Sequence, residues 1–287
     1  MIGRFLTWLT DAQAIWARPL GDAVHGFLHA LFHAVTPVRD LLNGRWLSHP
    51  LHAATTDIPI GTLLVTVVLD VVGQPGGADV ALALTLAFMV ASMLSGLADY
   101  ADTDGTARAR ATVHATLMVS ALVLLVLSAI LRAGGGDRGL PVVLAIVAFA
   151  IVIAGAFVGG DVVYALGNVV SRHAWRGAGG KWIRLEVDGG AAPADLPEGV
   201  PTKAKLGINT LALVRIGDRV HGLHDTCAHA GGPLSGGRIV DGCLECPWHG
   251  SRFRLEDGRA VRGPTVYDQP VYEVRLGDGG WEGRRTR

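Results

Sequence analysis

Cysteine is scarce in this 287-residue chain, which contains only Cys227, Cys243 and Cys246. Small secreted domains that use disulfides in place of a large core contain many more. The sequence therefore excludes a scaffold held together by disulfides. Because Cys227 and Cys246 belong to one motif, described below, Cys243 has no thiol partner, and we expect it to be a buried strand residue.

An excess of charge of one sign is also missing, because 25 Lys and Arg residues balance 25 Asp and Glu residues. The chain has no long basic run, whereas nucleic-acid-binding domains cluster their positive charge. We therefore expect no nucleic-acid partner. The N-terminus lacks an uninterrupted apolar stretch followed by a small-residue cleavage site, so we expect no signal peptide and a chain that is retained whole.

Apolar residues make up half of the chain, and the long apolar runs stop near residue 170. Four runs carry no charge through most of their length, and each is near or above the roughly 17–20 residues that a membrane-spanning helix needs. They are residues 58–72, 80–98, 112–131 and 140–166. The first run is the shortest and contains Asp70. Gly155 and Gly159 in the fourth run favour close helix packing. The sequence thus predicts a bundle of four transmembrane helices.

Lysine and arginine residues near these runs predict the orientation of the bundle. Four spans place both chain ends on one side of the membrane, and positive residues concentrate on the cytoplasmic side. Only Arg132 and Arg138 flank the spans on the opposite side. The side of the termini has Arg39, Arg45, Arg108, Arg110, Arg172, Arg176 and Lys181. We therefore predict that both termini and the C-terminal domain are cytoplasmic.

A further apolar pattern, at helical spacing, precedes the first span. It consists of Val24, Phe27, Leu28, Leu31, Phe32 and Val35. Another face of the same helix presents His25, His29 and His33. We predict an amphipathic helix that lies on the membrane surface. A metal site on the histidine face is the alternative, but no carboxylate or cysteine joins these residues at the same spacing.

From Lys181 onward the pattern changes to the period of two that is typical of β-strands. Alternating segments are separated by Gly-Asp, Asp-Gly and proline-containing turns, which predicts a small antiparallel all-β domain. The predicted fold is therefore a helical membrane bundle joined to a β domain. Its parts are an N-terminal amphipathic segment at residues 1–45, the four-helix domain at 46–170, a linker at 171–180 and the β domain at 181–287.

Two short segments of the β domain carry the residues with the clearest chemistry. One residue separates Cys227 from His229, and two residues separate Cys246 from His249. Two thiolates and two imidazoles are the ligand set of a [2Fe–2S] cluster in which cysteines hold one iron and histidines hold the other. Replacing two thiolates by neutral imidazoles makes such a cluster easier to reduce.

Two plainer interpretations of the same residues stay open. A zinc site would use two cysteines and two histidines, but structural zinc usually has two to four residues between paired ligands, and the first pair here has one. A disulfide between Cys227 and Cys246 would leave both histidines without a role.

The stretch from Cys227 to Gly250 resembles the Rieske family, and in particular its ferredoxin-type branch. The resemblance implies one [2Fe–2S] cluster per chain, with Cys227, His229, Cys246 and His249 as ligands. The glycines that follow each pair would let backbone N–H groups approach the bridging sulfurs.

Several positions differ from the respiratory Rieske proteins. Those proteins have two further cysteines, joined in a disulfide, where this chain has Gly232 and Trp248. Ser251 keeps a hydroxyl that in the respiratory branch bonds a bridging sulfide, but Phe253 replaces a tyrosine that donates to a ligand sulfur. Fewer hydrogen bonds to sulfur predict a potential in the lower part of the Rieske range of roughly −150 to +300 mV, which disfavours quinol oxidation of the cytochrome bc type.

The membrane half resembles an uncharacterised four-helix family that bacteria often fuse to a Rieske domain. The residues that carry this resemblance are 43–52, 57–61, 96–100 and His114. It implies a multi-pass protein of the bacterial plasma membrane.

The predicted topology gathers several polar residues at the cytoplasmic ends of the helices. Such groups can hold a quinone, a haem b or a proton path. They can equally cap helices, bond between helices or extend towards the interface. For a haem, we expect His52 and His114 to be the facing pair. The full set is His49, His52, Asp57, Asp99, Tyr100, His114 and Asp161.

The leading functional hypothesis is a membrane-anchored carrier of single electrons, with membrane lipid and an unidentified redox protein as partners. The alternative is a quinone- or haem-linked membrane oxidoreductase in which the bundle is a second redox site. A self-contained Rieske oxygenase would need a further domain with two histidines and a carboxylate on iron, whereas only 38 residues, none of them histidine, follow His249. A redox sensor ranks last, because no DNA-binding or signalling element accompanies the cluster motif.

Overall fold

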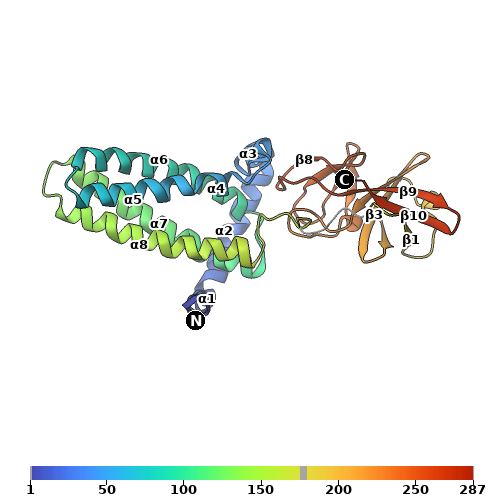
Figure 1. The fold of residues 1–287 in the computed structure, drawn as a ribbon, viewed down its shortest axis with the longest axis horizontal. Helices are drawn as coiled ribbons and strands as arrows, with labels where there is room; N and C mark the ends of the chain where they lie inside the picture. Colours follow the sequence, from blue (N-terminus) through green and yellow to red (C-terminus); the bar gives the residue numbers. More distant parts are fainter. Residues whose placement is uncertain (1, 175–179, 287) are drawn as a thin grey trace. The chain divides into compact units, whose positions relative to one another are not determined.

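The computed structural model describes residues 2–174 and 180–286 (Figure 1). The chain divides into two compact units. The helical unit contains residues 1–43 and 50–168, and the β unit contains residues 44–49 and 169–287. The predicted combination of long apolar helices and an antiparallel all-β domain is confirmed.

Four helical segments are long and apolar enough to cross a membrane: Leu51–Val71, Pro75–Tyr100, Gly105–Ala133 and Gly139–Ala165. The first consists of α4 (Leu51–Thr55) and α5 (Asp57–Val71). Pro59 has no N–H group to donate to the Thr55 carbonyl. The helix therefore lacks one hydrogen bond here, which accounts for the break at Thr56. This segment begins earlier than the predicted apolar run of residues 58–72, because its first turns contain polar residues. The others are α6 (Pro75–Tyr100), α7 (Gly105–Ala133) and α8 (Gly139–Gly160), which a π-helix extends over Asp161–Ala165.

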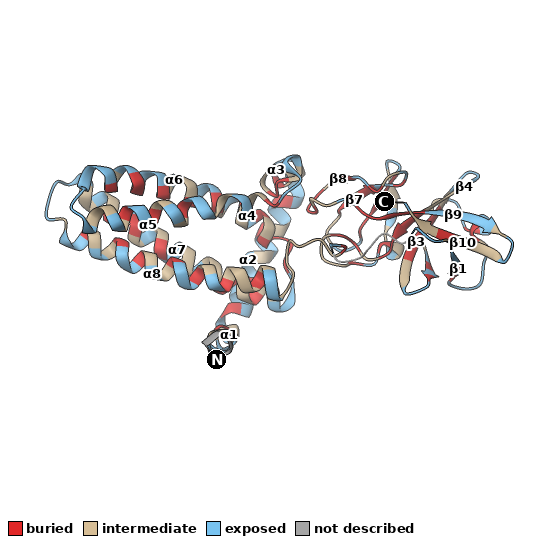
Figure 2. Cartoon of the chain, viewed as in Figure 1, coloured by how far each residue is buried: buried red, intermediate tan, exposed pale blue. Residues whose placement is uncertain are grey.

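These four segments lie side by side and share an apolar core, which includes Leu63, Leu82, Leu125 and Val152 (Figure 2). Large apolar side chains also cover their outer surface; Val80 and Ile130, for example, are more than half exposed. A helix that is apolar on all sides is typical of a membrane span.

The charge at Asp70 is neutralised at one end of the bundle. Arg132 on α7 binds Asp70 on α5 at 2.5 Å and Asp79 on α6 at 3.0 Å. Arg138, just before α8, also binds Asp79 at 2.6 Å. The side chains of Asp70 and Arg132 are almost fully buried, so this network ties four segments together where their ends meet.

Three further helices precede the spans: α1 (Ile2–Ala12), α2 (Ala14–Ala34) and α3 (Thr36–Leu42). All of the predicted amphipathic residues except Val35 lie in α2, which crosses one end of the bundle (Figure 1). Their apolar face is split in two. Leu28 and Phe32 are buried against Ala98, Tyr100 and Ala101. The exposed members are Val24, Phe27, Leu31 and Val35.

In the β unit, six strands form a closed antiparallel barrel in the order β1-β10-β9-β4-β3-β2. Their bounds are β1 Ile183–Val187, β2 Thr202–Leu206, β3 Asn209–Ile216, β4 Arg219–His224, β9 Val271–Gly277 and β10 Gly280–Arg285. A separate four-stranded sheet consists of β5 (Arg238–Val240), β6 (Cys243–Glu245), β7 (Arg252–Arg254) and β8 (Ala260–Arg262). Cys243 is buried in β6, as expected.

The first residues after the last helix also pack onto this unit. The Tyr267 hydroxyl donates a hydrogen bond to the Val169 carbonyl at 3.0 Å, and His173 Nε2 bonds the Thr226 carbonyl at 2.8 Å. Residues 171–174 of the predicted linker therefore contact the β unit, and residues 175–179 of that linker lie outside the described residues.

Candidate metal centre

The small sheet presents the two predicted ligand loops. Cys227 and His229 lie in the loop between β4 and β5, and Cys246 and His249 lie in the tight connection between β6 and β7. The two cysteines belong to one apolar cluster with Leu234, and they are only 1% and 3% exposed. Both histidines are half-buried. The sheet thus places sulfur inside and imidazole towards the surface.

The four side chains meet as two pairs. The Cys227 and Cys246 thiols are hydrogen-bonded to each other. The Nδ1 atoms of His229 and His249 are 3.3 Å apart, and their ring planes are nearly perpendicular. In the described residues no three His, Cys, Asp or Glu side chains gather around one point. A single zinc ion needs three or four protein ligands at one point, whereas two bridged irons need one pair each. The arrangement therefore fits a two-iron cluster better than zinc.

Backbone amides surround both sulfurs. The pKa of Cys246 is lowered to about 7, first by the hydrogen bond from Cys227 and then by N–H groups of Trp248 and His249. The pKa of Cys227 is raised because its thiol bonds Cys246 and is buried. N–H groups directed at sulfur stabilise negative charge there. A reduced iron–sulfur cluster carries additional negative charge, so these N–H groups favour its reduced state.

Glycine is required where the loops approach each other. A Cβ atom at Gly232 would lie 2.9 Å from the Trp248 ring and 3.1 Å from Cys246 Sγ. Gly231 and Gly250 have φ values of +90° and +74°, which residues with a side chain adopt rarely. Gly232 and Trp248, which stand where the respiratory branch has its disulfide, therefore lie in direct contact.

Three buried side chains that the sequence analysis did not single out hold the first loop in place. Gln269 accepts a hydrogen bond from the Ala228 N–H at 2.9 Å and donates to the carbonyls of His224 and Thr226. Asp225 accepts the Ser235 N–H at 2.7 Å. His173 binds the same Thr226 carbonyl. All lie outside the ligand motif, and no sequence pattern links them to it.

The expected serine and phenylalanine lie next to the ligand loops. Ser251 is fully buried, and its Oγ accepts the Thr265 N–H at 3.2 Å, which leaves its own proton free to donate. Phe253 is fully buried in the cluster that contains both cysteines and has no hydroxyl. Next to Cys246, the Glu245 carboxylate is buried, but hydrogen bonds from Arg252 and Arg238 outweigh burial and lower its pKa.

Comparison with known proteins decides the family. Residues 190–273 match the Rieske [2Fe-2S] domain. The anthranilate 1,2-dioxygenase ferredoxin subunit of Burkholderia cepacia is 34% identical over 85 residues, which are 30% of this chain and 79% of that protein. The chain belongs to the Rieske [2Fe–2S] family. Ferredoxin CarAc of Metapseudomonas resinovorans is 32% identical to this Rieske protein over 99 residues, 34% of this chain and 88% of that one.

A solved structure, the ferredoxin of carbazole 1,9a-dioxygenase from Nocardioides aromaticivorans, is 28% identical to the Rieske protein. It covers 37% of this chain and 99% of its own, with a TM-score of 0.32. The helical unit lies outside the residues that the Rieske family matches.

In the helical unit, most of the predicted polar residues have structural partners. Asp99 accepts a hydrogen bond from Asn43 at 2.7 Å, and Asp161 binds Arg110 at 2.6 Å. The Tyr100 hydroxyl lies 2.7 Å from Thr112 Oγ1. Asp57 is exposed in the first turn of α5. Asp99, Tyr100 and Asp161 therefore fit the interpretation of bonding between helices.

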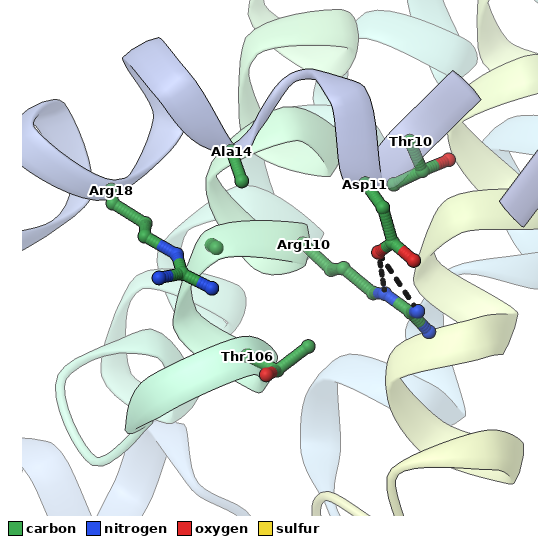
Figure 3. Close-up of a pocket in the computed structure, with 7 residues that line it drawn as sticks. Thr10, Asp11, Ala14, Arg18, Thr106 and Arg110 are labelled. Atoms are coloured by element: carbon green, nitrogen blue, oxygen red, sulfur yellow. Dashed lines mark hydrogen bonds and ion pairs between the residues drawn. The ribbon is translucent and has the colours of Figure 1, made fainter. Parts of the chain in front are cut away.

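A polar hollow of about 200 Å³ lies between α1, α2 and the start of α7 (Figure 3). Arg18 and Thr106 line it, and the ion pair between Asp11 and Arg110 closes one side. Asp161 also binds Arg110, so the charge of this arginine is already neutralised.

Proposed function

We propose that this protein is a membrane-anchored carrier of single electrons. In this proposal Cys227 and Cys246 hold one iron of a [2Fe–2S] cluster, and His229 and His249 hold the other. The observation that carries the proposal is the paired arrangement, with both sulfurs buried and both imidazoles partly accessible. When bound, the cluster supplies reversible one-electron redox chemistry.

The chain's own residues tune and protect that chemistry. Amides around each sulfur and the buried Ser251 hydroxyl stabilise the added negative charge, and the apolar cluster around Phe253 keeps water from the cysteines. The histidine edge is the path by which electrons enter and leave, because it is the accessible side of the ligand set.

A redox protein is the proposed partner at this edge. Trp248 is half exposed beside His249, with ring centroids 6.3 Å apart. Exposed tryptophan is enriched at protein interfaces. Two relatives are named as ferredoxins, one of them a dioxygenase subunit, so a reductase or an oxygenase component is the class of partner that this likeness favours.

The helical unit is proposed to anchor the Rieske unit in the bacterial plasma membrane. Its four apolar segments have the required length, and the excess of lysine and arginine at one end supports cytoplasmic termini. Exposed apolar residues of α2 would then contact the lipid interface. The domain boundaries 1–45, 46–170, 171–180 and 181–287 remain part of this proposal.

The second candidate function, an oxidoreductase with a further redox group in the bundle, is favoured by one observation. The rings of His52 and His114 lie close together, with centroids 6.2 Å apart.

A potentiometric titration of the detergent-purified protein, followed by EPR, tests the carrier function. We expect one reversible one-electron wave from the cluster, in the lower part of the span of roughly −150 to +300 mV. A wave near the upper limit, or a cluster that cannot be reduced reversibly, would contradict the proposal.

A further inference from the structure

Two histidines lie inside the helical unit on different segments. His52 is on α4, at the start of the first span, and His114 is on α7. His52 Nδ1 lies 2.8 Å from the Ser92 carbonyl of α6, and His114 Nδ1 lies 2.8 Å from the Gly155 carbonyl of α8. Each ring is therefore anchored to a neighbouring helix.

These hydrogen bonds determine where the protons are. A carbonyl can only accept, so each Nδ1 must be the donor and carry the proton. Each Nε2 is then left with a free lone pair, and in the described part of the chain neither Nε2 has a hydrogen-bond partner. An imidazole whose Nδ1–H bonds a backbone carbonyl and whose Nε2 is free is the usual form of a metal-ligating histidine.

Glycine makes room for both rings. A Cβ atom at Gly96 would lie 2.9 Å from His52 Cε1, and a Cβ atom at Gly159 would lie 2.9 Å from His114 Nδ1. Any larger residue at either position would displace the imidazole. Each ring thus lies directly against the backbone of the helix that it bonds.

The two rings are close neighbours, with centroids 6.2 Å apart and planes at 79°. A ligating nitrogen lies about 2 Å from its metal and about 1 Å from its own ring centre, so imidazoles on opposite sides of one metal have centroids about 6 Å apart. The observed separation matches that of two axial ligands on one ion.

The remaining surroundings select the kind of metal group. No third His, Cys, Asp or Glu joins the pair within the described residues, so a bare ion would lack the ligands it needs. Haem supplies four nitrogens of its own and needs only two axial ligands from the protein. Near the pair, the hydroxyls of Thr55 on α4 and of Ser92 and Ser95 on α6 bond one another or nearby carbonyls.

We propose that the helical unit binds one b-type haem, with His52 and His114 as its axial ligands. This second redox site goes beyond the proposed electron carrier and does not depend on the cluster assignment.

The full chain, purified in detergent from cells supplied with a haem precursor, tests the proposal by its visible spectrum and a pyridine haemochrome assay. We expect one haem b per chain, with a Soret band and the sharp α band of low-spin haem after reduction with dithionite. Titrating haem-free protein with hemin should regenerate that spectrum at one equivalent.

Variants separate ligation from folding. His52→Ala and His114→Ala should each lose the low-spin spectrum, whereas His33→Ala, at an exposed histidine of α2, should keep it. His114→Met should retain haem with an altered spectrum and a raised potential, because thioether replaces imidazole. Gly96→Val should disturb the α band, and Gly61→Val, where a Cβ meets nothing within 4 Å, should not.

The Rieske EPR signal of every variant serves as the folding control, and it keeps this test separate from that of the cluster. Several results would overturn the haem proposal. They are a wild-type protein that binds no haem even with added hemin, a bound quinone in place of haem, and an unchanged haem spectrum in both alanine variants.

Discussion

Gln269 contacts three backbone groups of the loop that presents Cys227 and His229. It is buried, and it accepts one hydrogen bond and donates two. Its position shows why the four ligands could be predicted from the sequence, whereas the residues that hold the ligand loop in place could not. The four ligands share one motif with a recognisable spacing, whereas Gln269 approaches the loop only because β9 pairs with β4.

Replacing Gln269 with leucine should weaken the loop. Three hydrogen bonds of about 1 kcal/mol each would be lost, so we expect a destabilisation of about 2–4 kcal/mol and faster loss of the cluster in denaturant. The rate at which the visible absorption bleaches is the measurement. Gln13→Leu, at a partly exposed glutamine of the helical unit, is the matched control, and equal bleaching rates for the two variants would disprove this role.

At the scale of elements, the apolar runs predicted the four long helical segments, but the ends of these segments depend on contacts that the sequence does not reveal. The first span begins seven residues earlier than its apolar run, at Leu51 in place of residue 58, since His52 and Thr55 bond within the bundle. Similarly, α2 was predicted as an amphipathic helix, but two of the six predicted apolar residues, Leu28 and Phe32, are buried against the end of α6. Asp70 interrupts its apolar run in the sequence, and its ion pairs with Arg132 and Arg138 explain how the charge is accommodated.

Breaking the ion pair between Asp70 and Arg132 should destabilise the bundle. Asp70→Ala leaves Arg132 buried without its main partner, which costs about 3–5 kcal/mol in comparable sites. Thermal unfolding in detergent should show this loss. Asp104→Ala, at an exposed aspartate without a side-chain capping bond, should be neutral.

The double variant Asp70→Leu/Arg132→Met should recover most of that stability, because it removes both charges. If Asp70→Ala unfolds at the same temperature as the unaltered protein, the network does not stabilise the bundle.

At the scale of the whole molecule, the chain joins a Rieske unit to a helical unit, and the Rieske match stops short of the helices. The proposed topology makes the loop between α7 and α8 external and the β9–β10 turn cytoplasmic. The natural cysteines are buried, so introduced cysteines can be labelled selectively.

In intact cells, a membrane-impermeant maleimide should label Gly136→Cys and leave Asp278→Cys unlabelled. Both should react after the membrane is broken, which controls for accessibility of the two sites. Labelling of Asp278→Cys alone in intact cells would show that the protein has the opposite orientation in the membrane.

The central claim is that Cys227, His229, Cys246 and His249 bind a Rieske cluster. EPR of the dithionite-reduced full-length protein tests it most directly, with His229→Ala, His249→Ala and the control His221→Ala measured alongside. We predict the signal of a reduced [2Fe–2S] cluster with histidine ligands in the unaltered protein and in the control, and its loss in both ligand variants. A normal signal in either ligand variant, or zinc in place of iron in the unaltered protein, would contradict the claim.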